Sequence, residues 1–121
     1  MARSRASAKA AGRTFEKDIA ECLAEHVDDR IERRRQSGAK DRGDLAAVRT
    51  HTGRRVVVEC KNYGGRVEVG PWLEEAEKER IHDDAAVGVV VAKRRGISDP
   101  LQQTVLMTVS DFVALLTGAR P

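Results

Sequence analysis

The sequence predicts an α/β domain in which a central mixed β-sheet is flanked by helices, in the element order αβββαββα. Apolar residues recur with helical spacing near both ends of the chain, and two strand-like segments meet across a short polar turn. One near-continuous apolar run is typical of a strand that is covered on both faces. With 121 residues, 40% of them hydrophobic and 34% charged, the chain is large enough for one core but not for two.

The chain begins with a basic segment. Residues 1–13 carry four basic side chains and no acidic one, and we expect residues 1–12 to form a disordered basic arm ahead of a single domain over residues 13–121. A helix is predicted over residues 14–28, with Thr14 near its N-cap. The apolar positions that predict this helix are Phe15, Ile19, Cys22, Leu23 and Val27.

Three strands are expected next. Residues 30–35 have the pattern of a short strand with a basic outer face, and the following residues 36–43 have the composition of a loop. Residues 44–50 and 54–62 are predicted to form a hairpin, because both are rich in β-branched or alternating apolar residues and a polar turn joins them.

The second half of the chain predicts two helices and two strands. A helix is expected over residues 71–82, with proline in its first turn, and a buried strand over residues 85–93. A last strand over residues 104–109 and a closing helix that ends at Gly118 complete the domain.

Composition excludes several classes of function. Aromatic residues are only 3% of the chain, which argues against recognition of nucleic acid by rows of stacking rings. Cys22 and Cys60 read as buried residues in a reducing compartment, so a cytoplasmic protein is expected. The cysteines and histidines have no zinc-binding spacing, and no apolar run is long enough to span a membrane. We expect no small-molecule cofactor.

The hairpin is predicted to bring three charged residues together. If it closes with the two-residue turn Thr52-Gly53, Asp44 lies opposite Lys61 and Ala46 lies opposite Glu59. Asp44, Glu59 and Lys61 then project from one face, about 5 to 8 Å apart. A three-residue turn would shift the pairing by one residue and separate the three side chains.

Two converging carboxylates repel each other unless a cation lies between them. Oxygen ligands favour Mg²⁺, for which we expect Mn²⁺ to substitute. Lys61 beside the ion would neutralise charge that develops on a phosphoryl group, so the pattern favours phosphodiester hydrolysis. The alternative is a structural ion pair between Asp44 and Lys61, with a stabilisation of about 0.2–1 kcal/mol.

The same residues resemble a known family. "GDLAAV" and "RRVVVECKN" are similar to the core of the PD-(D/E)XK nuclease superfamily, with Asp44, Glu59 and Lys61 at its acidic, acidic and lysine positions. Gly43 stands where the name of the superfamily has proline. "GRTFEKDIAECL" resembles the first helix of archaeal-type Holliday-junction resolvases and Mrr-type restriction endonucleases, in which Glu16 would complete the site. "GVVVAKRRG" resembles the later strand beside the hairpin.

The resemblance spans roughly residues 12–117 and implies a restriction-endonuclease-like fold. It further implies a Mg²⁺-dependent endonuclease of phage or bacterial kind, a homodimer that nicks four-way DNA junctions in recombination and repair. Asp44, Glu59 and the backbone carbonyl of Cys60 would hold the metal ion, with Glu16 acting through a water molecule.

We also expect a set of DNA contacts. "RRRQSGAKDRGDL" resembles the strand and loop with which such resolvases grip the junction, and the basic residues beside Asp44 and at the end of the buried strand would bind phosphates. Asn62 would orient Lys61 or the backbone beside the DNA. The full set is Arg34, Arg35, Ser37, Lys40, Arg42, Asn62, Arg94 and Arg95.

Two other functions stay open at this point. One is an Mrr-like restriction or repair nuclease that acts on duplex DNA. The other is a DNA-binding module without catalytic activity, whose affinity would depend on salt but not on divalent ions.

Overall fold

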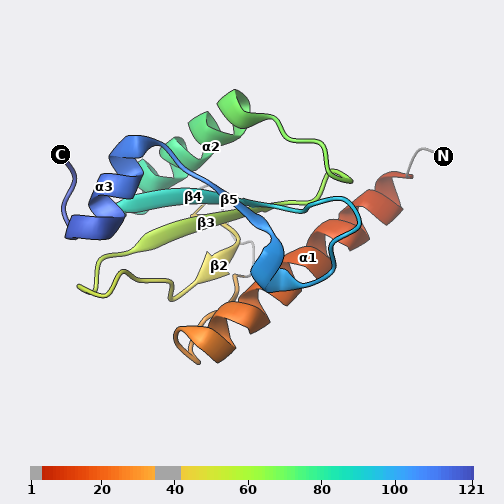
Figure 1. Cartoon of the computed structure of the whole chain (residues 1–121), viewed down its shortest axis with the longest axis horizontal. Coiled ribbons are helices and arrows are strands. Elements are labelled where there is room, and N and C mark those ends of the chain that lie inside the picture. The colour runs from red at the N-terminus through yellow and green to blue at the C-terminus, as the bar shows by residue number, and fades with distance from the viewer. Residues whose placement is uncertain (1–3, 35–41) are drawn as a thin grey trace.

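The computed structural model describes residues 4–34 and 42–121, and these form an α/β domain with a mixed sheet between helices (Figure 1). The predicted order αβββαββα is the observed order. The elements are α1 (Arg5–His26), β1 (Glu32–Arg33), β2 (Leu45–Ala46), β3 (Val56–Lys61), α2 (Val69–His82), β4 (Val87–Ala92), β5 (Thr104–Leu106) and α3 (Val109–Thr117), with a 3₁₀ turn over Pro100–Gln102 before β5.

The strands form two small sheets rather than the one central sheet that was expected. In the larger sheet the order is β3-β4-β5, with β3 parallel and β5 antiparallel to β4. The shorter strands β1 and β2 pair with each other in a separate antiparallel sheet.

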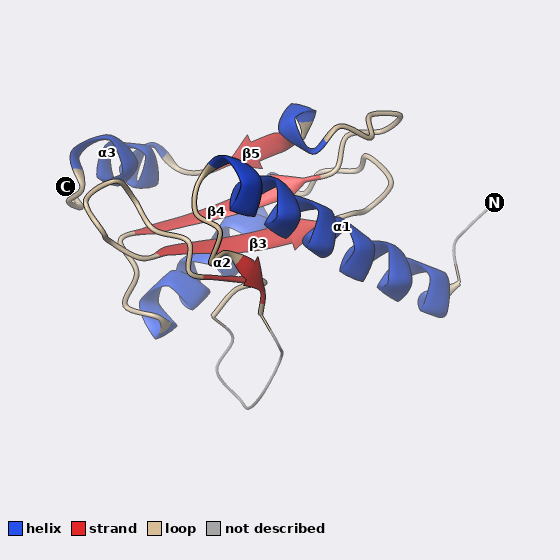
Figure 2. Cartoon of the chain, turned by 90° about the horizontal axis from the view of Figure 1, so that it is seen from below, coloured by secondary structure: helices blue, strands red, loops and turns tan. Residues whose placement is uncertain are grey.

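Helices cover both faces of the larger sheet (Figure 2). Side chains alternate between the two faces of a strand. Val89 of β4 therefore packs with the α1 residues Phe15 and Ile19, and its neighbour Val90 packs with Trp72 of α2. All six residues of β4 are buried, which confirms the prediction of a strand covered on both faces.

Helix α1 is longer than the sequence predicted. Its N-cap is Ser4, whose hydroxyl accepts a hydrogen bond from the Ser7 amide at 3.0 Å, and not Thr14. The helix includes residues 5–12, which were expected to be disordered. None of these residues is buried, and the first buried residue of the helix is Phe15. The apolar spacing therefore predicted only the packed part of α1.

The register of the hairpin also differs from the prediction. The Thr50 amide donates to the Arg54 carbonyl at 2.8 Å, so three residues form the turn instead of two. The Val56 amide donates to the Val48 carbonyl, and the Asp44 amide donates to the Val58 carbonyl. Between these two hydrogen bonds the first segment advances by four residues and β3 by only two. This bulge, in which Ala47 has a φ of 67°, places Asp44 beside Val58 and not opposite Lys61.

The predictions for the second half of the chain are close to the observed bounds. Helix α2 begins two residues earlier than expected, and α3 ends at Gly118, which caps it with a φ of 82°. In the part of the chain that the structure describes, no helix combines the length and apolar character that crossing a bilayer requires.

Candidate active site

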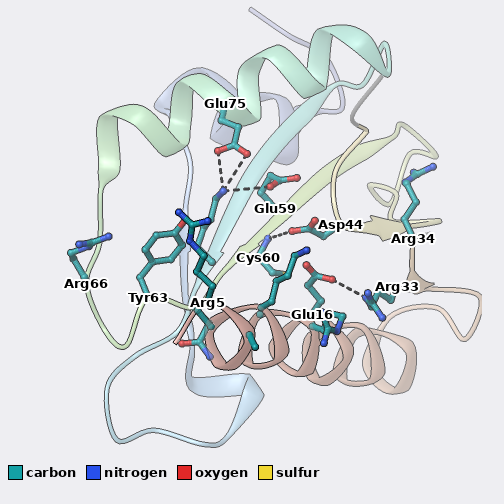
Figure 3. Close-up of a pocket in the computed structure, with 17 residues that line it drawn as sticks. Arg5, Glu16, Arg33, Arg34, Asp44, Glu59, Cys60, Tyr63, Arg66 and Glu75 are labelled. Atoms are coloured by element: carbon teal, nitrogen blue, oxygen red, sulfur yellow. Dashed lines mark hydrogen bonds and ion pairs between the residues drawn. The ribbon is translucent and has the colours of Figure 1, made fainter. Parts of the chain in front are cut away.

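An open pocket of about 1320 Å³ lies at the carboxyl end of β3, between the N-terminal half of α1 and the connector that leads to α2 (Figure 3). Its lining combines the predicted catalytic residues with cations. The charged residues that line it are Arg5, Lys9, Arg13, Glu16, Arg33, Arg34, Asp44, Glu59, Lys61, Arg66 and Glu75.

Asp44 is fixed against the edge of β3. One carboxylate oxygen, Oδ2, accepts the Cys60 amide hydrogen bond at 2.7 Å, and the Asp44 amide donates to the Val58 carbonyl at 2.8 Å. Gly43 makes this close approach possible, because its φ is +90° and a Cβ atom there would lie 2.9 Å from Val57 Cγ1. A proline, with φ near −65°, could not take this position.

Glu59 and Lys61 project from β3 toward α2. Glu59 is buried, with 4% of its surface exposed. The Lys61 ammonium lies 3.8 Å from a Glu59 oxygen and contacts both oxygens of Glu75, at 2.9 and 3.2 Å. Burial by itself lowers the pKa of Lys61, but the hydrogen bond that Lys61 donates to Glu75 and the charges of Glu75 and Glu59 outweigh burial and raise that pKa. Lys61 is therefore charged at neutral pH.

Glu16 reaches the pocket from α1. Its Oε2 atom accepts a hydrogen bond from Arg33 Nε of β1 at 2.8 Å, which fixes the carboxylate between the helix and the small sheet. The sequence predicted a site role for Glu16 but did not indicate Arg33 as its partner.

Cys60 lies at the centre of the three predicted carboxylates. Burial raises the pKa of its thiol, and the charges of Asp44, Glu16 and Glu59 raise that pKa further. The thiol is therefore neutral and is part of the core. The carbonyl of Cys60 lies on the same edge of β3 as the Val58 carbonyl, two residues earlier, and that edge faces Asp44.

The three predicted carboxylates do not form a single tight cluster. Among the described residues, the group whose oxygens all lie within 4.8 Å of one another is Glu59, Glu75 and Glu79, and neither Glu16 nor Asp44 belongs to it. The reason is that Glu59 faces α2, whereas Asp44 lies at the strand edge. The expected convergence of three carboxylates is therefore only partial, and Lys61 already lies against two members of the Glu59 group.

Oxygen donors of the pocket could nevertheless hold a hard cation. Asp44 has a carboxylate at the edge of β3, Glu59 has one that faces α2, and the carbonyl of Cys60 lies on the Asp44 edge. All are oxygen donors, which is the chemistry that Mg²⁺ requires of a protein.

Two of the predicted DNA-contact residues line the pocket. Arg34 donates to the Leu45 carbonyl at 3.4 Å. Asn62 links the connector to α1, because its amide donates to Ala11 at 3.5 Å and its oxygen accepts from Gly64 at 3.3 Å.

Three of the other predicted DNA contacts, Arg42, Arg94 and Arg95, lie outside the pocket. Arg42 forms an ion pair of 3.9 Å with Asp83 and does not line the pocket. Arg94 and Arg95 are exposed beyond the end of β4 and also lie outside the pocket, although Arg95 Nε donates to the Gly64 carbonyl at 3.1 Å. Arg35, Ser37 and Lys40 fall outside the described residues.

Sequence reasoning missed several residues that line the pocket. Glu75 lies on α2 and contacts Lys61, but no local pattern links it to a residue fourteen positions earlier. Arg5, Lys9 and Arg13 are spaced four residues apart, which is a helical signal that the absence of apolar residues obscured.

Comparisons of the chain with protein-family models, with curated proteins and with solved structures found no match. Functional conclusions about this chain therefore rest on its own residues and on the geometry of the pocket.

Proposed function

We propose that the protein is a metal-dependent endonuclease that hydrolyses phosphodiester bonds in DNA. The observation that carries this proposal is the lining of one pocket by Asp44, Glu59 and Lys61, with Glu16 beside them and cations around the rim. Acidic oxygens suit a cation that activates water, and a basic rim suits a polyanion, so the combination fits a phosphodiester substrate.

In this proposal Asp44, Glu59 and the Cys60 carbonyl hold Mg²⁺ or Mn²⁺, and Glu16 contributes through a water molecule. When bound, such an ion polarises a phosphoryl oxygen and lowers the pKa of bound water. Lys61 stays protonated and stabilises negative charge on the phosphoryl group. The hydrogen bond from the Cys60 amide keeps the Asp44 carboxylate in place, so the site is positioned before substrate arrives.

We further propose a restriction-endonuclease-like fold and a homodimer that acts on four-way junctions. The observed element order supports the fold, which was expected from the resemblance. Exposed apolar side chains on β5 and α3 support a contact with a second copy of the chain, because large apolar groups are costly in water. The most exposed of them are Val105, Val109 and Leu116, at 51%, 77% and 62%.

The test compares cleavage of a labelled four-way junction with cleavage of linear duplex of the same sequence, with and without Mg²⁺. We expect Mg²⁺-dependent nicking of the junction and a loss of at least about 100-fold in Asp44→Asn. Asp18→Asn is the matched control, since Asp18 is an exposed acid of α1 outside the pocket.

The outcomes separate the candidate functions. Equal or faster cutting of linear duplex would favour an Mrr-like nuclease. Salt-dependent binding without strand scission, unaffected by divalent ions, would favour a non-catalytic DNA-binding module. Activity in Asp44→Asn equal to that of the native protein would refute the proposed site.

A further inference from the structure

The N-terminal half of α1 carries a row of cations along the pocket. Arg5, Lys9 and Arg13 are spaced four residues apart, so they lie on one face of the helix. All three are exposed and line the pocket that contains Asp44 and Lys61. We call Arg5, Lys9 and Arg13 the α1 basic row.

The α1 basic row is electrostatically unfavourable in the protein alone. Like charges four residues apart on a helix destabilise it by about 0.2–0.5 kcal/mol per pair. Cations near the N-terminus also oppose the helix dipole, and the first turn contains no acidic residue to offset them. No burial accompanies this cost, because residues 5–12 include no buried side chain. An anion over this face would reverse the sign of both electrostatic effects.

The shape of the helix also suits a rod-like polyanion. Ala6, Ala8 and Gly12 lie between the cations and line the same pocket. Because alanine and glycine are small, they leave space for a bound strand beside the helix. From Arg5 to Arg13 the helix rises about 12 Å. One strand of B-DNA carries a phosphate about every 3.4 Å along its axis, so the row can accompany about three phosphates.

One further cation, Arg66, lines the pocket from the connector, where it forms an ion pair with Glu68 at 3.2 Å. Arg66, on the connector before α2, lies 5.3 Å from the centre of the Tyr63 ring, and its side chain is 66% exposed. Figure 3 shows Arg5 on α1 and Arg66 on the connector with Tyr63 between them, both on the same side of Glu59, Asp44 and Glu16. A strand that reaches the acids along α1 would therefore pass the α1 basic row, with Arg66 on the connector nearby.

We propose that the α1 basic row binds the phosphates of the DNA strand that flanks the scissile bond, independently of base sequence. This inference rests on the proposed nuclease function and adds a DNA-binding element to it. Backbone contacts of this kind position a substrate without specifying its sequence. The α1 basic row would thus set the position of the bound strand relative to Asp44 and Lys61.

The experiment measures binding of labelled duplex and four-way junction by fluorescence anisotropy, without divalent ions, over a range of salt concentrations. The test variant is Arg5→Gln/Lys9→Gln/Arg13→Gln. The matched control is Lys17→Gln/Arg49→Gln/Lys78→Gln, which removes the same charge from three exposed residues outside the pocket. Circular dichroism establishes that both variants keep the helical content of the native protein.

The expected readout is the slope of log K against log salt concentration. Each lost phosphate contact reduces the slope by about 0.9, so the test variant should lose about 2 to 3 and the control should lose much less. The variant Arg5→Lys/Arg13→Lys keeps the charges and should keep the slope. Equal slopes in the two triple variants would overturn the inference.

A separate cleavage assay distinguishes this failure from a failure of the proposed function. If the native protein nicks DNA and the two triple variants bind with equal slopes, only the role of the α1 basic row is wrong. If the native protein neither binds nor nicks DNA, the proposed function fails, and the inference that rests on it fails with it.

Discussion

The Lys61 ammonium is held by Glu75, at 2.9 and 3.2 Å from the two carboxylate oxygens, and only more distantly by Glu59, at 3.8 Å. The side chain of Lys61 is 14% exposed and that of Glu75 is 42% exposed, so the lysine end of this ion pair is largely buried while water reaches the carboxylate. From helix α2, Glu75 thus positions the proposed catalytic lysine of β3 and raises the pKa of that lysine.

Replacing Glu75 with glutamine is expected to lower the pKa of Lys61. The negative charge that raises this pKa is lost and the amide oxygen accepts only a weaker hydrogen bond, while burial, which lowers the pKa, remains. The ammonium would then deprotonate at lower pH, and the basic limb of the pH–rate profile for nicking should move to lower pH. NMR titration of isotope-labelled lysine measures the pKa of Lys61 directly.

The control for this variant is Glu74→Gln, which removes an exposed acid one residue earlier on α2. It should leave the pH–rate profile and the Lys61 titration unchanged. A Glu75→Gln protein with the native Lys61 pKa would show that Glu75 does not set the protonation of this lysine.

Gly43 is expected to be indispensable for the position of Asp44. In Gly43→Ala, the new Cβ would meet Val57 Cγ1 at 2.9 Å and the Val58 carbonyl oxygen at 3.0 Å, at a φ of +90°. We expect a loss of about 2–4 kcal/mol in the free energy of unfolding, from backbone strain and overpacking together. Nicking should also fall, because Asp44 would be displaced from β3.

Gly53→Ala isolates the backbone part of this effect. Gly53 has a similar φ of +86°, but a Cβ there would have no neighbour within 4 Å. Urea unfolding should therefore show a loss of only about 1–2 kcal/mol. Equal losses for the two variants would mean that the approach of Gly43 to β3 is not crowded.

The sequence predicted the order of elements because apolar spacing reports burial, and burial decides where β4 and α3 form. The same reasoning could not predict residues 5–12 of α1, which bury nothing. The hairpin register was wrong because the bulge at Ala47 is a tertiary feature: alanine has no intrinsic preference for positive φ.

Part of the candidate site could be predicted despite the wrong register. Asp44, Glu59 and Lys61 line one pocket, although the bulge places Asp44 at the strand edge instead of opposite Lys61. Contacts between side chains of elements that are distant in the sequence could not be predicted from local sequence patterns. Glu75 could be assigned to Lys61, and Arg33 to Glu16, only once the helices were placed against the sheet.

Arg33 is expected to position Glu16 for metal binding. In Arg33→Ala the hydrogen bond of 2.8 Å to Glu16 is lost, and the carboxylate gains freedom to leave the pocket. The Mg²⁺ concentration for half-maximal nicking should rise about 10-fold, as for other residues that orient a metal ligand. Metal titration at saturating DNA separates this effect from weaker DNA binding.

The neighbouring Arg30→Ala serves as the control for Arg33→Ala. Arg30 is exposed and pairs with Asp28, away from the pocket. Its removal should leave the Mg²⁺ dependence unchanged. If Arg33→Ala has native Mg²⁺ dependence but weaker DNA affinity, Arg33 contacts the substrate instead of positioning Glu16.

The end of the chain is expected to stabilise the fold without affecting the chemistry. Arg120 contacts the buried Asp111 of α3 at 2.5 Å and the Ala86 carbonyl at 2.7 Å. Arg120→Ala leaves the Asp111 carboxylate, 5% exposed, without that counter-charge, so urea unfolding should show a loss of about 2–3 kcal/mol in the free energy of unfolding.

The control is Arg49→Ala, at an exposed site, which should lower the free energy of unfolding by less than about 0.5 kcal/mol. Nicking by protein that circular dichroism shows to be folded should be unchanged, because neither residue lines the pocket. Reduced nicking by folded Arg120→Ala protein would instead indicate that α3 transmits a structural change to β3.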